Sequence, residues 1–192
     1  LTATIGNATF QDVTVSIDGT GGTATEGTDF GTVSDITISA GATTGTTSFT
    51  PTDDSIYDAT SNETAGISVS AVSGGGASEN GDQSVTITIT DNESAPTVTL
   101  SRSSSAIEEN SGSTVTITAT LSVVTFQDVT VSIDGTGGTG TEGTDFGTVS
   151  DITISAGATA GTVTFDPTDD SVYEGNETAT IAISSVSGGD AT

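Results

Sequence analysis

The sequence has no cysteine, histidine, methionine or tryptophan, and Arg102 is its single basic residue against 26 acidic ones. The absence of Cys excludes disulfides and thiolate metal sites. Without His or Cys, zinc and copper sites are disfavoured, because these metals prefer imidazole and thiolate ligands. The formal net charge of -25 argues against nucleic acid and anionic membrane surfaces as partners, since both are bound through Lys and Arg. Metal cations or a salty medium are the expected counter-charges.

Long apolar runs are also missing, so no membrane insertion is expected. The chain offers no His, Cys or Lys as a base or an activated nucleophile, which argues against an enzyme. A carboxylate pair can hydrolyse glycosides, but sugar sites usually carry aromatic side chains. Here there are only two Tyr and no Trp. The sequence therefore favours a binding or structural module.

What the chain does contain is Val and Ile alternating with Thr, as in V-T-I-T-A-T and V-T-I-T-I-T. This period of two predicts strands with one buried face, and no segment shows a helical period. Short strands between turn signals predict an all-β fold, with antiparallel β-sandwiches of immunoglobulin-like type. The predicted strands are 97–101, 113–122, 127–134, 150–156, 161–167 and 177–186, with 83–91 as the last strand type.

An internal duplication organises the chain. Residues 10–49 and 126–165 align without gaps at an offset of 116, and they differ at only four of 40 positions. We expect one domain over 1–93 that lacks its first strand and one over 94–192 that lacks its last strand. Two explanations stay open: the chain is an excerpt of a longer array, or neighbouring chains supply the missing strands.

Each copy carries a dense acidic loop, TDDSIYDATSNET in the first and TDDSVYEGNET in the second. Two like charges about 4 Å apart repel by about 4 kcal/mol at an effective dielectric near 20. A Ca²⁺ ion reverses that cost, because it accepts about 6–8 oxygen ligands. The spacing is not that of an EF-hand, so other loops must contribute. The candidates are Asp145 with its counterpart Asp29, the segment 108–110, and the segment 91–93.

A plainer interpretation is that these loops are solvated surface with no specific metal. Seven other acids are expected to be surface charge: Asp12, Glu26, Asp35, Asp82, Asp128, Glu142 and Asp151. Tyr57 and Tyr173 lie inside the acidic loops. We expect both to pack beside those loops rather than to act in a site.

The ordered set of motifs resembles the Calx-beta repeat, the calcium-binding module of sodium/calcium exchangers, which also occurs in large bacterial surface proteins. The motifs are GTGTEGTDF (138–146), ISAGATAGTVTFDPTDDSVYEGNET (154–178) and VTITITDNE (85–93). The resemblance covers nearly the whole chain. It implies a sandwich whose Ca²⁺ ligands gather at one tip.

The resemblance also implies a ligand set for each copy. In copy two the implied ligands are Glu109, Asp145, Asp169, Asp170, the carbonyl of Val172, Glu174 and Glu177. In copy one they are Asp29, Asp53, Asp54, the carbonyl of Ile56, Asp58, Glu63, Asp91, Asn92 and Glu93.

The leading hypothesis is a structural, calcium-rigidified repeat of a long bacterial extracellular or cell-surface protein, an adhesin stalk or a fibre. Its expected partners are neighbouring repeats of the same protein or identical subunits in a filament. Two alternatives remain. One is a calcium-sensing domain pair, and the other is a filament subunit completed by strand exchange.

Overall fold

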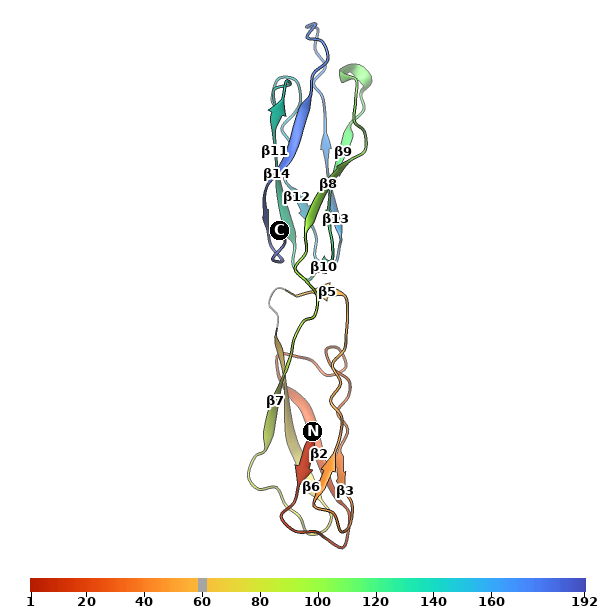
Figure 1. The fold of residues 1–192 in the computed structure, drawn as a ribbon, viewed down its shortest axis with the longest axis vertical. Helices are drawn as coiled ribbons and strands as arrows, with labels where there is room; N and C mark the ends of the chain where they lie inside the picture. The colour runs from red at the N-terminus through yellow and green to blue at the C-terminus, as the bar shows by residue number, and fades with distance from the viewer. Residues whose placement is uncertain (59–61) are drawn as a thin grey trace. The chain divides into compact units, whose positions relative to one another are not determined.

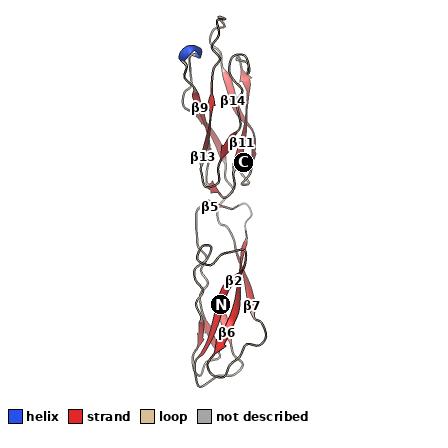
Figure 2. Ribbon diagram, turned by 180° about the vertical axis from the view of Figure 1, so that it is seen from behind, coloured by secondary structure: helices blue, strands red, loops and turns tan. Residues whose placement is uncertain are grey.

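The computed structural model describes residues 1–58 and 62–192 and divides into two compact units, drawn in Figure 1. Unit 1 comprises Leu1–Asp54 and Ser61–Asp91. Unit 2 comprises Asn92–Thr192 together with Ser55–Thr60, a short segment that precedes the rest of the unit in the sequence. Strands dominate both units (Figure 2), and nearly all of their pairings are antiparallel. The predicted all-β fold of tandem antiparallel sandwiches is confirmed.

Unit 1 contains a four-stranded sheet in the order β3-β2-β6-β7 and a two-stranded sheet β1-β4. The strands are β1 Thr2–Thr4, β2 Val13–Gly22, β3 Ile36–Ile38, β4 Thr44–Thr46, β6 Glu63–Ser73 and β7 Ser84–Ile89. Val13, Val15 and Ile17 alternate inward along β2, as the period of two predicted.

Unit 2 contains two three-stranded sheets, β12-β11-β14 and β13-β9-β8. Its strands are β8 Val98–Arg102, β9 Val115–Leu121, β11 Val129–Gly138, β12 Ile152–Ile154, β13 Ala160–Phe165 and β14 Ala179–Ser187. A further two-residue parallel pair joins β10, Val124–Thr125, to β5, Ile56–Tyr57. The helical element η1, Glu109–Ser111, is a single 3₁₀ turn. Among the described residues, no helix is long and apolar enough to cross a membrane.

Each unit has its own apolar core, and one Phe pair occupies the same place in both. Phe30 packs on Phe49 with ring centroids 4.9 Å apart, and Phe146 packs on Phe165 at 5.0 Å. Phe30 and Phe146 are almost completely buried. Both follow the glycine-rich turn after a long strand, so the core anchors the loop that carries Asp29 or Asp145.

Candidate metal centre

The candidate site lies where two loops of unit 2 meet. The first loop, residues 139–151, follows β11, and the second, residues 166–178, joins β13 to β14. Backbone hydrogen bonds hold the loops together at both ends of the second one. Thr168 N–H donates to the Asp145 carbonyl at 2.9 Å, and Thr139 and Gly140 N–H both donate to the Thr178 carbonyl. The acidic loop is therefore fixed at its two ends against the turn that carries Asp145. We call this hydrogen-bonded pair of loops the loop frame.

Asp145 is itself held in a tight turn. Its Oδ2 accepts the Thr141 N–H at 2.6 Å, and its own N–H donates to the Thr141 carbonyl at 2.9 Å. Gly138, the last residue of β11, leads into this turn with φ +106. A Cβ at Gly138 would lie 2.0 Å from the Thr178 carbonyl oxygen, so glycine is required for the two loops to approach.

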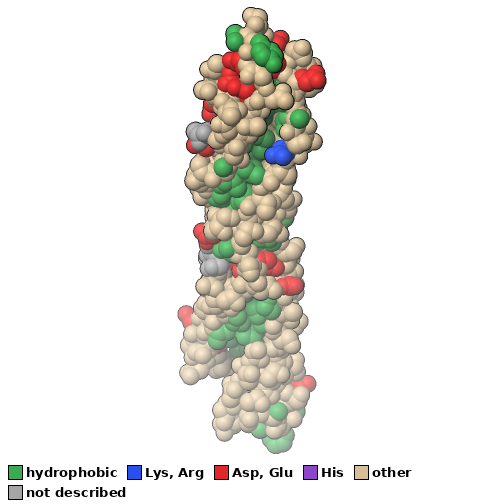
Figure 3. All heavy atoms as spheres, turned by 45° about the horizontal axis from the view of Figure 1, so that its top comes forward, with side chains coloured by type: hydrophobic (Ala, Val, Ile, Leu, Met, Phe, Trp, Pro, Cys, Tyr) green, Lys and Arg blue, Asp and Glu red, His purple; other side chains and the backbone are tan. Residues whose placement is uncertain are grey.

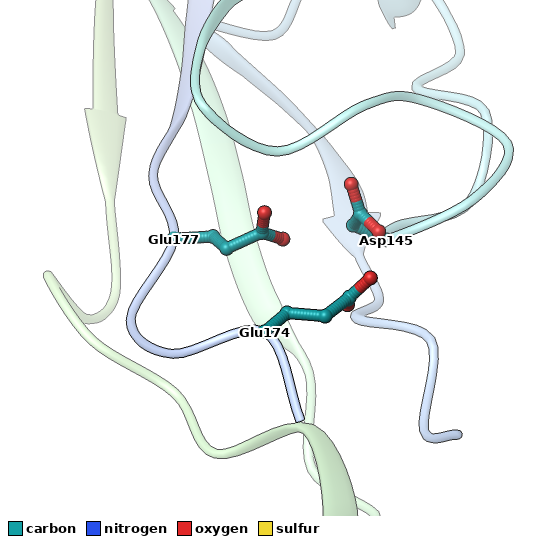
Figure 4. A group of neighbouring side chains, drawn as sticks. All are labelled: Asp145, Glu174 and Glu177. Atoms are coloured by element: carbon teal, nitrogen blue, oxygen red, sulfur yellow. The ribbon is translucent and has the colours of Figure 1, made fainter. Parts of the chain in front are cut away.

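Three carboxylates converge in this frame, as Figure 4 shows. One oxygen each from Asp145, Glu174 and Glu177 lies within 4.8 Å of the others. All three were predicted from the sequence. Glu174 and Glu177 are exposed and Asp145 is half-buried. On the face drawn in Figure 3, acidic side chains gather at the loop-bearing end of unit 2.

The electrostatics of the group are unfavourable without a cation. Local loss of solvent, followed by the charges of Asp145, Asp170, Glu177 and Glu109, raises the pKa of Glu174 above its ordinary value. The pKa of Glu177 is also raised, first by the same desolvation and then by Asp145 and Glu109. Ionised carboxylates in this arrangement repel each other, which favours a proton or a metal ion between them.

The remaining copy-two candidates surround the three carboxylates without joining that group. Glu109, in η1, and Asp170 are close enough for their charges to act on Glu174. Asp170 Oδ1 accepts the Val172 N–H at 2.6 Å, and Val172 is exposed. Asp169 is exposed and lies outside the group. Ligation by Glu109, Asp169, Asp170 and the Val172 carbonyl stays a prediction.

Copy one repeats the supporting frame. Thr52 N–H donates to the Asp29 carbonyl at 2.9 Å, and Thr23 and Ala24 N–H donate to the Thr64 carbonyl. Asp29 Oδ2 accepts the Thr25 N–H at 2.6 Å, as Asp145 accepts that of Thr141. The other copy-one candidates stay predictions. Asp53, Asp54, Ile56, Asp58 and Glu63 lie on either side of residues 59–61, which are outside the described residues, and Asp91, Asn92 and Glu93 follow β7.

Two expectations about neighbouring residues are wrong. Glu26 and Glu142 are half-buried rather than simple surface charge, and their Oε1 atoms accept the N–H groups of Val33 and Val149. They close the turns that carry Asp29 and Asp145. Tyr173 does not pack beside the acidic loop, since its side chain is 97% exposed.

The donor set fits Ca²⁺. It consists only of carboxylate oxygens, which are the ligands of hard divalent cations. The carboxylates come from exposed loops that tolerate the irregular geometry Ca²⁺ accepts, whereas Mg²⁺ demands near-ideal octahedral ligands. Asp145, Glu174 and Glu177 would hold the ion, and its positive charge would offset the desolvation and the repulsion that together raise the pKa of both glutamates.

The sequence was compared with curated proteins and with protein families over its whole length. No curated protein matches it. The Calx-beta domain family matches twice, over residues 4–93 and over residues 91–192. These ranges span nearly all of the sequence, and each contains one of the two frames described above. The chain therefore belongs to the Calx-beta domain family, as two tandem copies of that domain.

Proposed function

We propose that this chain is a structural repeat module that Ca²⁺ stiffens, within a long extracellular stalk or fibre of a bacterial cell surface or matrix. Calx-beta domains are tandem β-sandwich modules of structural or regulatory type, and they are associated with calcium binding. The observation that carries the proposal is the convergence of Asp145, Glu174 and Glu177 within 4.8 Å from two different loops. An ion bound there would tie those loops together.

The near-identity of the two copies supports a structural role over a sensing role. A sensor pair gains from two sites with different affinities, whereas a spacer gains from number and uniformity. Residues 10–49 and 126–165 differ at four of 40 positions, and the loop frames share the same hydrogen bonds. A stalk also fits weak sites, because extracellular modules bind Ca²⁺ at millimolar levels.

An extracellular setting is part of the proposal. The Thr-rich, Cys-free chain needs no reducing compartment, and its formal charge of -25 keeps it soluble in salt. Neighbouring repeats of the same protein, or identical subunits, are the proposed partners. The family is structural or regulatory in type, and the proposed role involves no catalysis.

Thermal unfolding of the chain in EDTA, in millimolar Ca²⁺ and in equal Mg²⁺ tests the calcium part. A cation present at about 100 times its dissociation constant adds about 2.7 kcal/mol per site to the free energy of unfolding. We expect a Ca²⁺-selective rise in Tm that saturates with concentration. An equal response to Mg²⁺ would indicate charge screening alone and would contradict the proposal.

A matched pair of variants localises the effect. Glu177→Gln removes one charge from the three-carboxylate group, and Asp134→Asn removes one from the exposed face of β11, outside the group. The Ca²⁺ response should shrink in the first variant and persist in the second. Equal responses would place the ion elsewhere. Force spectroscopy of a tandem polyprotein then tests stiffening, which should require Ca²⁺.

A further inference from the structure

The strand β5 is the starting point. It comes from the acidic loop of copy one, yet it is part of the compact unit 2. It pairs in parallel with β10, with Ile56 opposite Val124 and Tyr57 opposite Thr125. The Tyr57 hydroxyl also donates to Asp190 Oδ2 at 3.2 Å. Both the backbone and a side chain of β5 therefore contact the rest of unit 2.

The edge that receives β5 in unit 2 is the strand β10, and this edge is covered. Thr125 is 1% exposed, and Val124 is half-buried. In copy one the same two positions are Ala8 and Thr9, at the offset of 116. Ala8 is exposed and Thr9 is half-buried. The following Phe is 105% exposed at Phe10, against 58% at its counterpart Phe126. In copy one these two positions and the following Phe are thus more exposed than their counterparts in unit 2.

The exposed edge Ala8–Phe10 of copy one makes the same two hydrogen bonds as its covered counterpart in unit 2. Gly41 N–H donates to the Thr9 carbonyl at 2.8 Å, and Gly157 N–H donates to the Thr125 carbonyl at 2.9 Å. The two threonine hydroxyls donate to the carbonyls two residues on, at 2.6 and 2.7 Å. An open hollow lies on the copy-one edge, lined by Ala8, Thr9, Phe10, Ala40 and Gly41. The copy-one edge therefore shares both of these hydrogen bonds with its counterpart in unit 2.

The counterpart of β5 in copy two is also present, and its side chains are exposed. Val172 and Tyr173 stand in TDDSVY where Ile56 and Tyr57 stand in TDDSIY. Val172 is 59% exposed and Tyr173 is 97% exposed. In Figure 3, apolar side chains show at the same tip of unit 2 as the acids. An aromatic side chain this exposed is available for a contact with another molecule, and aromatic side chains are enriched at interfaces.

We propose that Val172 and Tyr173 dock on the edge Ala8–Phe10 of a second copy of this chain, and so repeat between chains the contact that β5 makes with β10. Val172 would lie opposite Ala8, and Tyr173 opposite Thr9. The segment Val172–Tyr173 and the edge Ala8–Phe10 are different surfaces of the chain, so the contact is head-to-tail. The inference goes beyond the calcium-stiffened module, because the contact depends on strand pairing and on the side chains of Val172 and Tyr173, whereas the predicted Ca²⁺ ligand at Val172 is its carbonyl.

One difference sets the expected strength. Asp190 accepts the hydrogen bond from the Tyr57 hydroxyl. Beyond the acidic loops the two copies align at an offset of 114, so the residue of copy one that corresponds to Asp190 is Gly76. The contact between chains therefore lacks that hydrogen bond, and Ala8 replaces the larger Val124. Gly76 has φ +70 with nothing within 4 Å of an added Cβ, and Asp190 has φ +50. Asp tolerates this backbone conformation, so Gly76→Asp should restore the acceptor.

Disulfide trapping tests the contact directly, because the chain has no native cysteine. The double variant Ala8→Cys with Val172→Cys should form covalent dimers and higher multimers under mild oxidation. The positive control is Ile56→Cys with Val124→Cys, which are paired residues within unit 2 and should close inside one chain. Monomers alone from the first variant, with closure in the control, would overturn the proposal.

Sedimentation equilibrium measures the contact without cross-links. High salt is needed, because the net charge of -25 opposes association and screening shortens its range. Tyr173→Ser and Phe10→Ser should each lower the association constant about tenfold, and Gly76→Asp should raise it. Val85→Ser, at an equally apolar but separate exposed position, should leave it unchanged.

The same measurement in EDTA and in Ca²⁺ separates this proposal from the previous one. Association that survives in EDTA and falls with Tyr173→Ser supports docking, whatever the calcium result. A chain that stays monomeric at millimolar concentration and high salt overturns docking and leaves the calcium proposal standing. Equal association constants for Tyr173→Ser and Val85→Ser would also overturn it.

Discussion

The carboxyl groups of Asp145 and Glu177 converge, with one oxygen from each lying within 4.8 Å of the other, although the two residues lie on different loops and 32 positions apart in the chain. The loops therefore hold the two carboxylates close enough for their charges to repel, and a proton or a cation between them would relieve that repulsion. The backbone frame, rather than attraction between the side chains, keeps them together.

Neutralising one member of this pair should have opposite consequences with and without Ca²⁺. In EDTA, Glu177→Gln removes repulsion from the group, so Tm should stay equal or rise. In millimolar Ca²⁺ the variant lacks a ligand, so Tm should fall below that of the wild-type chain. Differential scanning calorimetry in both buffers measures the crossing. A variant that is less stable than wild type in both buffers would mean that Glu177 stabilises the loop by other contacts.

The pH dependence follows from the raised pKa of Glu174 and Glu177. The folded state binds these protons more tightly than the unfolded chain, whose Glu has the ordinary value of 4.5. Their contribution to stability is therefore fully present below pH 4.5 and is lost as pH rises through the raised folded-state pKa. In EDTA, acidification from neutral pH into that window should raise Tm. In Ca²⁺ the trend should weaken or reverse, because protons displace the ion.

The double variant Glu174→Gln with Glu177→Gln provides the comparison for this titration. Its Tm in EDTA should change less between neutral pH and the window just above pH 4.5 than that of wild type. General repulsion among the other acids acts on both proteins and cancels in the difference. Identical pH profiles would show that these two carboxyls titrate alike in the folded and unfolded states.

The Phe pair in each core should be a large contributor to stability. Phe146 is 2% exposed and packs on Phe165. Phe146→Ala should reduce the free energy of unfolding by about 3–5 kcal/mol, through lost burial and the cavity left behind. Phe126→Ala, at a 58% exposed position, is the matched control and should cost well below that. Urea unfolding measures both, and similar costs would contradict the core assignment.

Gly138 should be essential to the loop frame. Gly138→Ala places a Cβ against the Thr178 carbonyl and forces a positive φ on Ala. We expect a loss of at least about 1 kcal/mol in the free energy of unfolding. Because Thr178 accepts the N–H groups that position the Asp145 turn, the Ca²⁺ response should fall as well.

Gly140→Ala serves as the control for that variant. Copy one already has Ala24 at this position, and the added Cβ would meet Glu177 Oε2 at 3.5 Å, an ordinary contact. Its stability should differ from wild type by about 0.5 kcal/mol or less. A loss equal to that of Gly138→Ala would indicate that any side chain in this turn is disruptive, whatever its backbone conformation.

Much of the fold could be predicted from the sequence because its signals are local. Alternation of Val and Ile with Thr depends only on the period of two, and it predicted β9, β11 and β14 close to their observed bounds. The duplication is also a property of the sequence alone. The three carboxylates of the candidate site were among the predicted ligands, because acid density and the family motifs both indicate them.

The sequence by itself thus determined the β-sandwich class, the repeat and the acidic composition of the loops. Only the tertiary structure decided which acids meet, because the distance between Asp145 and Glu177 depends on hydrogen bonds between two loops. It also decided that Glu142 closes a turn, and that Tyr57 contacts Asp190 while Tyr173 stays exposed. Nearly identical local sequences such as TDDSIY and TDDSVY cannot differ by local preference, so their different surroundings come from the chain packed around them.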